Sequence, residues 1–174
     1  GVIPQISIML GPCAGGAAYS PALQDLIIMV EKNSYMFLTG PEVIKAVTGE
    51  EINADQLGGS DVHMSISGVA HLSAKDELQA MALVRKYLSF LPSNNIENPP
   101  FSQPTQTHKK KNEALNSIIP LDPTEPYVMH QVIGHIVDPD SFLEIQPLWA
   151  RNAIVGHARI GGYSVGIVAQ EPSV

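Results

Sequence analysis

The sequence predicts an α/β fold, in which buried strands alternate with helices. Three observations predict it. Residues 2–10 form an almost uninterrupted apolar run bounded by Pro4 and Gly11, which is typical of a strand buried on both faces. A glycine-rich turn follows this run and should open a helix. Further along, apolar residues recur at helical spacing after Ser73, which indicates a longer helix behind the strands.

The next elements follow from short apolar runs and the residues between them. Residues 26–30 and 35–38 are predicted to be two more buried strands, joined by a turn over 31–34. Thr39 can cap a helix that has Pro41 in its first turn and Glu42 at the capping-box position. This helix should run to about Val47 and stop at Gly49.

A longer helix is expected after Ser73, which can cap it with Asp76 at the third position. Its apolar face would consist of Leu78, Met81, Val84, Leu88 and Leu91, and Pro92 would end it. Residues 92–125 are rich in Pro, Asn, Ser, Thr and Lys, which favours an inter-domain linker.

A second domain is predicted from residue 126. Pro126 should start a short helix that carries Val128, Met129, Val132, Ile133 and Ile136. Residues 154–160 should pair with 163–169 across Gly161-Gly162, a strong signal for a two-residue hairpin. One helix and one hairpin bury too little apolar surface to be stable alone, so we expect this domain to continue beyond Val174.

Composition narrows the class of protein. The chain has 174 residues, 44% of them hydrophobic, 16% charged, which is typical of a soluble globular domain. A formal charge of −7 argues against a nucleic-acid partner. No apolar run is long enough to span a membrane and no secretory signal is recognisable, so we expect a cytoplasmic protein, or one of an organelle matrix. A single cysteine, Cys13, excludes internal disulfides.

The turn over residues 10–21 is the best candidate for chemistry. A turn between a strand and a helix directs backbone N–H groups and the positive end of the helix dipole toward a small anion. The turn lacks the Gly-Lys-Ser/Thr of a phosphate-binding loop and the Gly-x-Gly-x-x-Gly of dinucleotide folds. On the residues alone, glycines that simply allow close packing remain the alternative.

Other reactive side chains lack a recognisable catalytic or metal-binding spacing. Cys13 is expected to be structural, and Lys109–Lys111 a solvated loop with phosphate binding as the alternative. The histidines are expected to have ordinary polar or packing roles: His63, His71, His108, His130, His135 and His157. The carboxylates of the turn-rich stretch should keep it soluble: Glu50, Glu51, Asp55 and Asp61. No metal site and no acid/base pair stand out.

The chain as a whole resembles one enzyme family. The motifs that carry the likeness lie in order along the sequence: Gly1–Ser7, Gly11–Leu23, Thr39–Glu50, Leu57–Gly59, Ser67–His71, Leu88–Asn95, Pro126-Tyr127, Phe142–Glu144, Gln146–Leu148 and Val165–Ala169. Together they resemble the carboxyltransferase (beta) subunit of biotin-dependent acyl-CoA carboxylases, of the propionyl-CoA carboxylase type.

This resemblance implies a crotonase-type α/β fold with two related domains. Residues 1–91 would then be the C-terminal part of the acyl-CoA-binding N-domain, 92–125 the linker, and 126–174 the start of the biotin-binding C-domain. It also implies a homo-oligomer, typically a hexamer, whose active sites form between the first domain of one subunit and the second domain of its neighbour. Biotin would be carried on a partner, the biotin carboxylase and carboxyl-carrier alpha subunit.

The resemblance further implies chemistry without a side-chain base. The carboxyl group would pass from carboxybiotin to the α-carbon of an acyl-CoA, through an enolate that backbone amides stabilise. The expected donors are the amides of Gly16 and Ala17, with Gly15, Ala14 and Tyr19 in contact with the substrate. The chain departs from the family at two places: His157 replaces an aromatic residue, and Gln170-Glu171-Pro172 replaces Asn-Gln-Pro.

Two other functions remain open at this point. One is the carboxyltransferase subunit of a biotin-dependent methylmalonyl-CoA decarboxylase or of a transcarboxylase, which runs the same half-reaction. The other is a non-catalytic paralogue that serves as a scaffold for active subunits.

Overall fold

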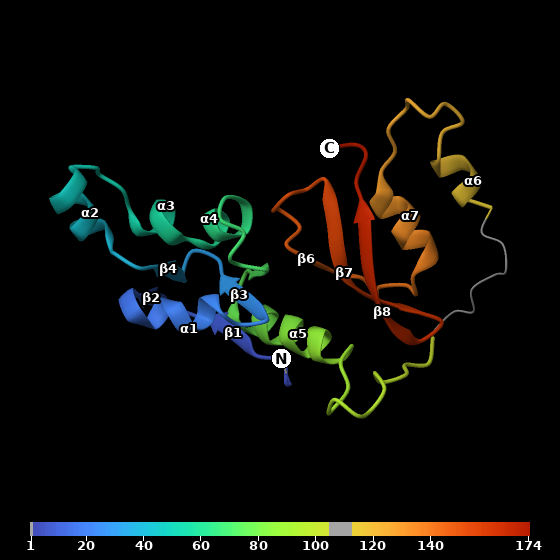
Figure 1. The fold of residues 1–174 in the computed structure, drawn as a ribbon, viewed down its shortest axis with the longest axis horizontal. Helices are drawn as coiled ribbons and strands as arrows, with labels where there is room; N and C mark the ends of the chain where they lie inside the picture. The colour runs from blue at the N-terminus through green and yellow to red at the C-terminus, as the bar shows by residue number, and fades with distance from the viewer. Residues whose placement is uncertain (1, 105–112) are drawn as a thin grey trace. The chain divides into compact units, whose positions relative to one another are not determined.

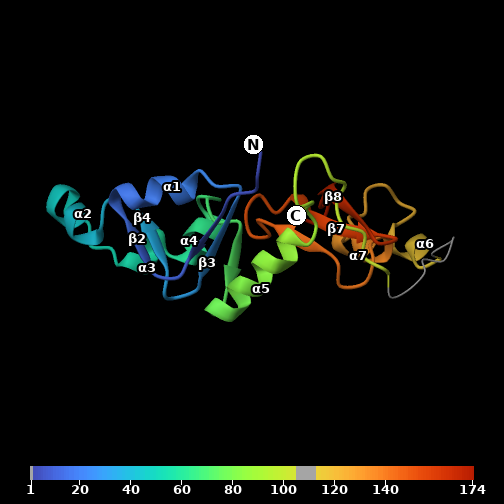
Figure 2. The ribbon, with the colours of Figure 1, turned by 90° about the horizontal axis from the view of Figure 1, so that it is seen from below.

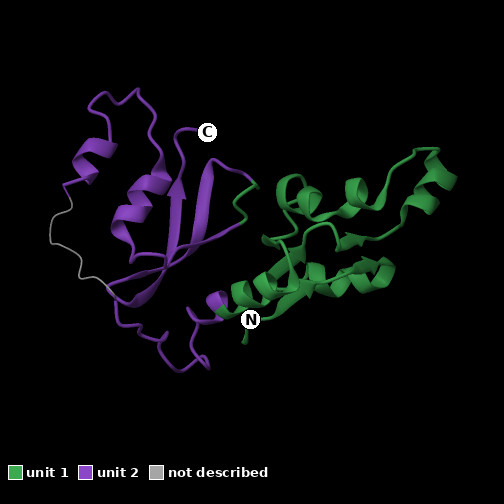
Figure 3. Ribbon diagram, turned by 180° about the vertical axis from the view of Figure 1, so that it is seen from behind, with its two compact units in different colours: residues 1–85, 146–149 green, residues 86–145, 150–174 purple. Residues whose placement is uncertain are grey.

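The computed structural model describes residues 2–104 and 113–174. The chain divides into two compact units, which Figure 3 shows in green and purple. Unit 1 comprises Gly1–Arg85 and Gln146–Trp149, and unit 2 comprises Lys86–Ile145 and Ala150–Val174. Unit 1 contains two small sheets and unit 2 contains one, and each unit has its own buried apolar residues.

A parallel three-stranded sheet forms the centre of unit 1 (Figure 1). Its strands are β1 (Ile6–Met9), β3 (Leu26–Val30) and β5 (Leu72–Ala74), in the order β1-β3-β5. All five residues of the central strand β3 are buried, as its continuous apolar run predicts. The strand predicted over residues 2–10 is therefore only partly right. Only Ile6–Met9 pair with β3, and the residues before them are exposed.

A second, two-stranded sheet supports the glycine-rich turn. Strand β2 (Pro12–Ala14) runs parallel to β4 (Tyr35–Phe37), so the strand predicted over 35–38 is confirmed for three of its residues. The chain then enters the 3-10 helix η1 (Gly15–Ala18) and the short helix α1 (Tyr19–Ala22). The predicted helix after the turn is thus present, but it begins as a tighter helix.

Three helices lie between β4 and β5. Helix α2 spans Pro41–Thr48 and ends at Gly49, whose φ of 76° confirms the predicted stop. The predicted cap at Thr39 is wrong, because Gly40 occupies the N-cap and no side chain caps the helix. Helix α3 (Ala54–Gly58) has a complete capping box in which Asn53 and Gln56 bond reciprocally. Helix α4 (Ser60–Ser65) follows directly.

Helix α5 (Glu77–Leu88) begins later than predicted. Ser73 lies in strand β5 and does not cap the helix. Asp76 does so instead, because its Oδ1 accepts a hydrogen bond from the amide of Gln79 at 2.7 Å. The predicted core-facing stripe is also wrong for three of its members, since Leu78, Met81 and Leu88 are exposed in this chain. Ala80 is the fully buried residue of the helix.

Unit 2 is an antiparallel sheet covered on one face by helix α7. The strands are β6 (Leu143–Ile145), β7 (Ala153–Ile160) and β8 (Tyr163–Gln170), in that order. The predicted hairpin is confirmed, with β7 and β8 paired along their whole length. Asp138 fixes its turn by accepting hydrogen bonds from the amides of Gly161 and Gly162 at 2.8 and 2.7 Å.

Two helices precede this sheet, α6 (Leu115–Ile118) and α7 (Met129–Ile136). The sequence placed the start of the second one at Pro126, which is wrong, since its N-cap is Val128. Figure 2 shows α7 alongside β7 and β8. The core between them contains Ile133, Val137, Ile154 and Ala158, with Met129, Phe142, Val165, Ile167 and Ala169 packed around it.

Candidate functional site

The glycine-rich turn is the candidate site, and its backbone conformation explains why glycine is needed there. Gly15 has a φ of +65°, a conformation that L side chains rarely adopt. It connects the extended Ala14 (φ −121°, ψ 153°) to η1 and so redirects the chain from strand to helix within one residue. The backbone conformation of the turn therefore accounts for a glycine at position 15.

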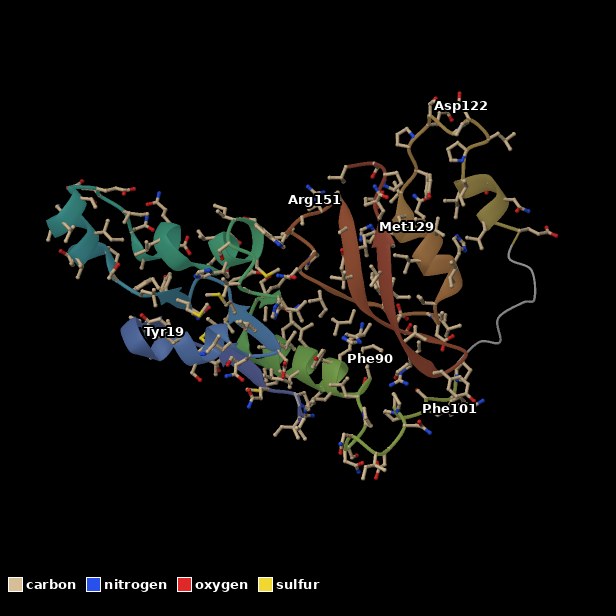
Figure 4. All side chains as sticks on the ribbon, viewed as in Figure 1. Tyr19, Phe90, Phe101, Asp122, Met129 and Arg151 are labelled. Atoms are coloured by element: carbon tan, nitrogen blue, oxygen red, sulfur yellow. The ribbon has the colours of Figure 1, made fainter. Side chains whose placement is uncertain are left out.

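The structure brings the five predicted site residues together on one short segment. Ala14 ends β2, Gly15 to Ala17 form the first three residues of η1, and Tyr19 begins α1, where Figure 4 labels it. Ala14, Gly16, Ala17 and Tyr19 are exposed, and Gly15 is partly buried. These four residues are therefore accessible at the surface of unit 1.

The residues beneath the turn hold it in place. Ala18 is 4% exposed and packs in the core of unit 1, which is rich in methionine. The core cluster that contains Ala18 consists of Met9, Ala18, Met29, Met36, Met64 and Ala70, with Cys13 and Val69 packed against it. Cys13 thus has the structural role that the sequence predicted. Ala14 pairs with Phe37 in the parallel β2–β4 ladder, so β4 fixes the position of the residue at which the turn begins.

The two candidate donors are not equivalent. In a 3-10 helix each amide bonds to the carbonyl three residues earlier, as the bond from the Tyr19 amide to the Gly16 carbonyl shows. The amide of Gly16 precedes the first such bond, whereas Ala17 is the first position at which the pattern supplies an acceptor, the carbonyl of Ala14. Gly16 is therefore the freer donor of the pair.

Gly16 also has open space around it. A Cβ added at this position meets no heavy atom of the described chain within 4 Å, and its φ is not positive. The same holds for Gly11 at the start of the turn. Neither glycine is therefore required by packing within the described residues.

A cluster of one imidazole and two carboxylates lies in unit 2, and sequence reasoning missed it. His130 Nδ1 lies 3.1 Å from Glu171 Oε2, and His130 Nε2 lies 2.8 Å from Glu144 Oε2. Glu171, which is 4% exposed, also accepts hydrogen bonds from the Met129 amide at the start of α7 and from Ser173. Its members are separated by 14 to 41 residues, so no local motif signals the cluster.

The cluster perturbs the ionisation of its members. Burial alone would raise the pKa of Glu171, but hydrogen bonds from Ser173, Met129 and His130 lower this pKa to about 2. Burial likewise works to lower the pKa of His130, yet the two carboxylates that face its nitrogens raise it above the usual value. The cluster anchors the first turn of α7 to the strands beside it, which is a structural role.

The other histidines that the structure describes have polar or packing partners, as expected. His71 Nδ1 accepts from the Ile27 amide at 2.9 Å, and burial lowers the pKa of His71. His63 bonds the Met36 carbonyl and the Ser67 hydroxyl. His157 packs against the rings of Tyr87 and Phe90, and burial lowers its pKa as well. His108 and Lys109–Lys111 lie outside the described residues.

The acidic stretch after α2 has no paired carboxylates. Glu51 forms an exposed ion pair with Lys45 at 2.7 Å, beside a shallow cleft lined by Pro41, Glu42, Ile52 and Asn53. Within residues 2–104 and 113–174, no group of three His, Cys, Asp or Glu side chains could hold a metal ion. In the same residues no helix has both the length and the apolar character needed to cross a membrane.

The fold and the turn together define a class of α/β protein in which a glycine-containing turn joins a short strand to a helix. The chain matches the carboxyl transferase domain over residues 1–174, and it belongs to that family. The resemblance stated from the motifs is thereby confirmed.

Known proteins of this family are similar along the whole chain. It is 49% identical to the propionyl-CoA carboxylase carboxyltransferase subunit of Haloferax mediterranei and 51% identical to the methylmalonyl-CoA decarboxylase subunit alpha of Veillonella parvula. Each match covers 100% of this chain and 34% of the relative. The chain therefore spans about a third of the length of these relatives.

A solved structure supports the fold. A crystal structure of transcarboxylase 12S, described as a hexamer with hydrolysed methylmalonyl-coenzyme A bound, superposes with a TM-score of 0.93 at 50% identity. The match covers 99% of this chain and 34% of that one. The crotonase-type α/β fold expected from the sequence is thus confirmed.

Proposed function

We propose that these residues are part of the carboxyltransferase of a biotin-dependent acyl-CoA carboxylase of the propionyl-CoA or acetyl-CoA type. Family membership along the whole chain supports this, as does 49% identity to a propionyl-CoA carboxylase subunit. Carboxybiotin carried on a partner protein would supply the carboxyl group. The chain's own part is to bind the acyl thioester and to stabilise the enolate formed at its α-carbon.

The turn of η1 is the proposed oxyanion site. The amides of Gly16 and Ala17 would donate to the thioester oxygen as negative charge develops on it, with Gly16 as the principal donor. Gly15 would allow the close approach, and Ala14 and Tyr19 would contact the acyl-CoA. The exposure of Ala14, Gly16, Ala17 and Tyr19 and the open space at Gly16 support this assignment.

Gly16→Val tests the site because the structure separates folding from function at this residue. A Cβ added at this position meets no heavy atom of the described chain within 4 Å, so we expect a substitution here to leave unit 1 folded and to act on the bound ligand. Gly11→Val is the matched control, since Gly11 is equally open and precedes β2. Cys13→Ser should be mild, because Cys13 only packs against the core.

We expect Gly16→Val to lower kcat/KM by about 10²-fold or more, because its side chain would keep the thioester oxygen away from the amides, with an effect like that of losing one oxyanion donor. The assay is carboxylation of propionyl-CoA by the full-length subunit assembled with its partners. Equal activity of Gly16→Val and Gly11→Val would contradict the assignment.

The proposal extends to the assembly. We propose that residues 1–91 form the end of an acyl-CoA-binding domain, 92–125 a linker, and 126–174 the start of a biotin-binding domain. The partition into two compact units and the antiparallel hairpin of unit 2 support a two-part organisation. A hexamer is proposed from the transcarboxylase 12S hexamer at 50% identity. The proposed partner is a biotin carboxylase and carboxyl-carrier alpha subunit, and the proposed location is the cytoplasm or the mitochondrial matrix.

A second function has support from the same comparisons. The Veillonella parvula methylmalonyl-CoA decarboxylase subunit is 51% identical, and transcarboxylase 12S is 50% identical, so these residues would equally serve either enzyme. Co-purification separates the possibilities: a biotin carboxylase partner favours the carboxylase, whereas a membrane-embedded partner favours the decarboxylase. Isotope exchange of the carboxyl group between methylmalonyl-CoA and free biotin would be absent in a scaffold paralogue.

A further inference from the structure

His63 on α4 makes two hydrogen bonds through its ring and one through its main-chain carbonyl. Its Nε2 lies 2.6 Å from the Met36 carbonyl, which can only accept, so Nε2 donates. Nδ1 lies 2.8 Å from the Ser67 hydroxyl. The His63 carbonyl accepts from the Ala70 amide at 3.1 Å. The ring is therefore clamped between strand β4 and the loop after α4.

The carbonyl that His63 reaches lies in a confined place. Met36 is 4% exposed, and the backbone of Gly58 approaches its carbonyl so closely that a Cβ at 58 would overlap it. A buried carbonyl without a donor costs free energy, and the His63 ring supplies a donor to this one.

Strand β4 transmits this support to the turn. Met36 pairs with Cys13 and Phe37 with Ala14 in the parallel β2–β4 ladder. The residue after Ala14 is Gly15, and the nearest atom to a Cβ at Gly15 is the carbonyl oxygen of Leu38, which directly follows β4. The strand that leads into the turn is thus paired with β4 up to Ala14, and Leu38, the residue after β4, lies near Gly15.

We propose that His63 is a positioning residue that holds the amides of Gly16 and Ala17 at the height needed to receive the thioester oxygen, acting through Met36 and the β2–β4 ladder. This inference rests on the proposed function of the turn. His63 does not contact the substrate. Its imidazole fixes the backbone from which the donors project, and such small displacements matter because oxyanion donors act at short range.

The test compares His63→Leu with His63→Gln in the full-length subunit assembled with its partners. Glutamine keeps an N–H donor near the position of Nε2, and leucine removes it. We expect leucine to lower kcat by about 10-fold or more with KM for acyl-CoA changed by less than about 3-fold, because the loss falls on the transition state. Glutamine should restore most of kcat. Deuterium uptake by a peptide covering 13–18 should rise in the leucine variant only.

His71→Leu is the matched control. It removes another hydrogen bond between a histidine and a backbone group of unit 1, the one to the Ile27 amide, without touching β4. We expect it to lower stability while kcat and uptake over 13–18 stay unchanged. If His63→Leu loses stability like His71→Leu but retains kcat, the positioning role is overturned.

Two further variants belong to this test. Gly16→Val in the same assay reports on the proposed site itself, so that its harmlessness would refute the proposed function independently of His63. If leucine prevents folding, His63→Asn replaces it, because its shorter amide can reach Ser67 but not the Met36 carbonyl. Wild-type kcat in that variant would likewise overturn the inference.

Discussion

Replacing Glu171 with glutamine removes the buried carboxylate that ties helix α7 to the end of strand β8. The carboxylate accepts from the Met129 amide at 3.0 and 3.2 Å, from His130 Nδ1 at 3.1 Å, and from the Ser173 amide and hydroxyl at 3.3 and 2.8 Å. Glutamine has one acceptor oxygen, and its NH₂ group would face donors. The variant therefore loses the charge and part of the hydrogen bonding at once.

The cost follows from the ionisation of Glu171. Its pKa falls from 4.5 to about 2, because the hydrogen bonds from Ser173, Met129 and His130 outweigh the opposing effect of burial. One pKa unit corresponds to about 1.4 kcal/mol, so the bound carboxylate contributes about 3 kcal/mol to folding. Because the folded pKa is the lower one, this contribution is complete above pH 4.5 and is lost as the pH falls toward 2. At pH 3 about 1.4 kcal/mol remains.

The measurement is the free energy of unfolding of unit 2 within the full-length protein, from urea titration read by hydrogen exchange of β7 and β8 peptides. We expect wild type to exceed Glu171→Gln by about 3 kcal/mol at pH 7 and by about half of that at pH 3. Glu125→Gln, at an exposed position without an ion pair among the described residues, should match wild type at both. A difference that is absent at pH 7, or that does not shrink with acid, would refute the reasoning.

Three further perturbations follow from single contacts. Burial lowers the pKa of His157, so the His157→Phe variant should become more stable relative to wild type as the pH falls below 6.5. Thermal unfolding at pH 8 and pH 5.5 measures this, and a stability difference between the two proteins that does not change with pH would contradict it. Gly68→Ala should destabilise unit 1 by about 1–3 kcal/mol and shift the fluorescence of Trp149, because a Cβ at this position would lie 2.7 Å from the indole and the φ of Gly68 is +68°. The control is Gly134→Ala, which has open space on α7 and should not destabilise the protein. Asn53→Ala should cost about 1 kcal/mol by urea unfolding, since it removes the capping box of α3.

The strands that the sequence predicted well are those with a long, unambiguous pattern. Leu26–Val30 is apolar throughout and is the central strand, and Gly161-Gly162 between two eight-residue strands left one plausible pairing. Strand β2 could not be predicted in the same way. Three residues, one of them proline, have no measurable period, and their partner lies more than twenty residues away.

The predicted first residue of a helix was wrong where two residues could each serve as its N-cap. Ser73 and Asp76 both precede the helical pattern, and only the pairing of Ser73 into β5 decides between them. The burial predicted for the apolar stripe of α5 was wrong for a different reason. Helical periodicity identifies an apolar face, but it does not say whether another part of the protein covers that face. Leu78 belongs to that stripe and is 83% exposed in this chain.

A site built from main-chain amides leaves no characteristic side chain in the sequence. A glycine in the sequence can, however, indicate a left-handed backbone conformation, as Gly15 does with its φ of +65°. In the proposed site, the residues around the turn are ordinary ones: Ala18 in the core, Phe37 paired with Ala14, and Met36, whose carbonyl accepts a hydrogen bond from His63. Selection for the chemistry would therefore act on packing and hydrogen bonds beneath the turn. Substitutions at these positions should therefore alter turnover although none of their side chains contacts the substrate.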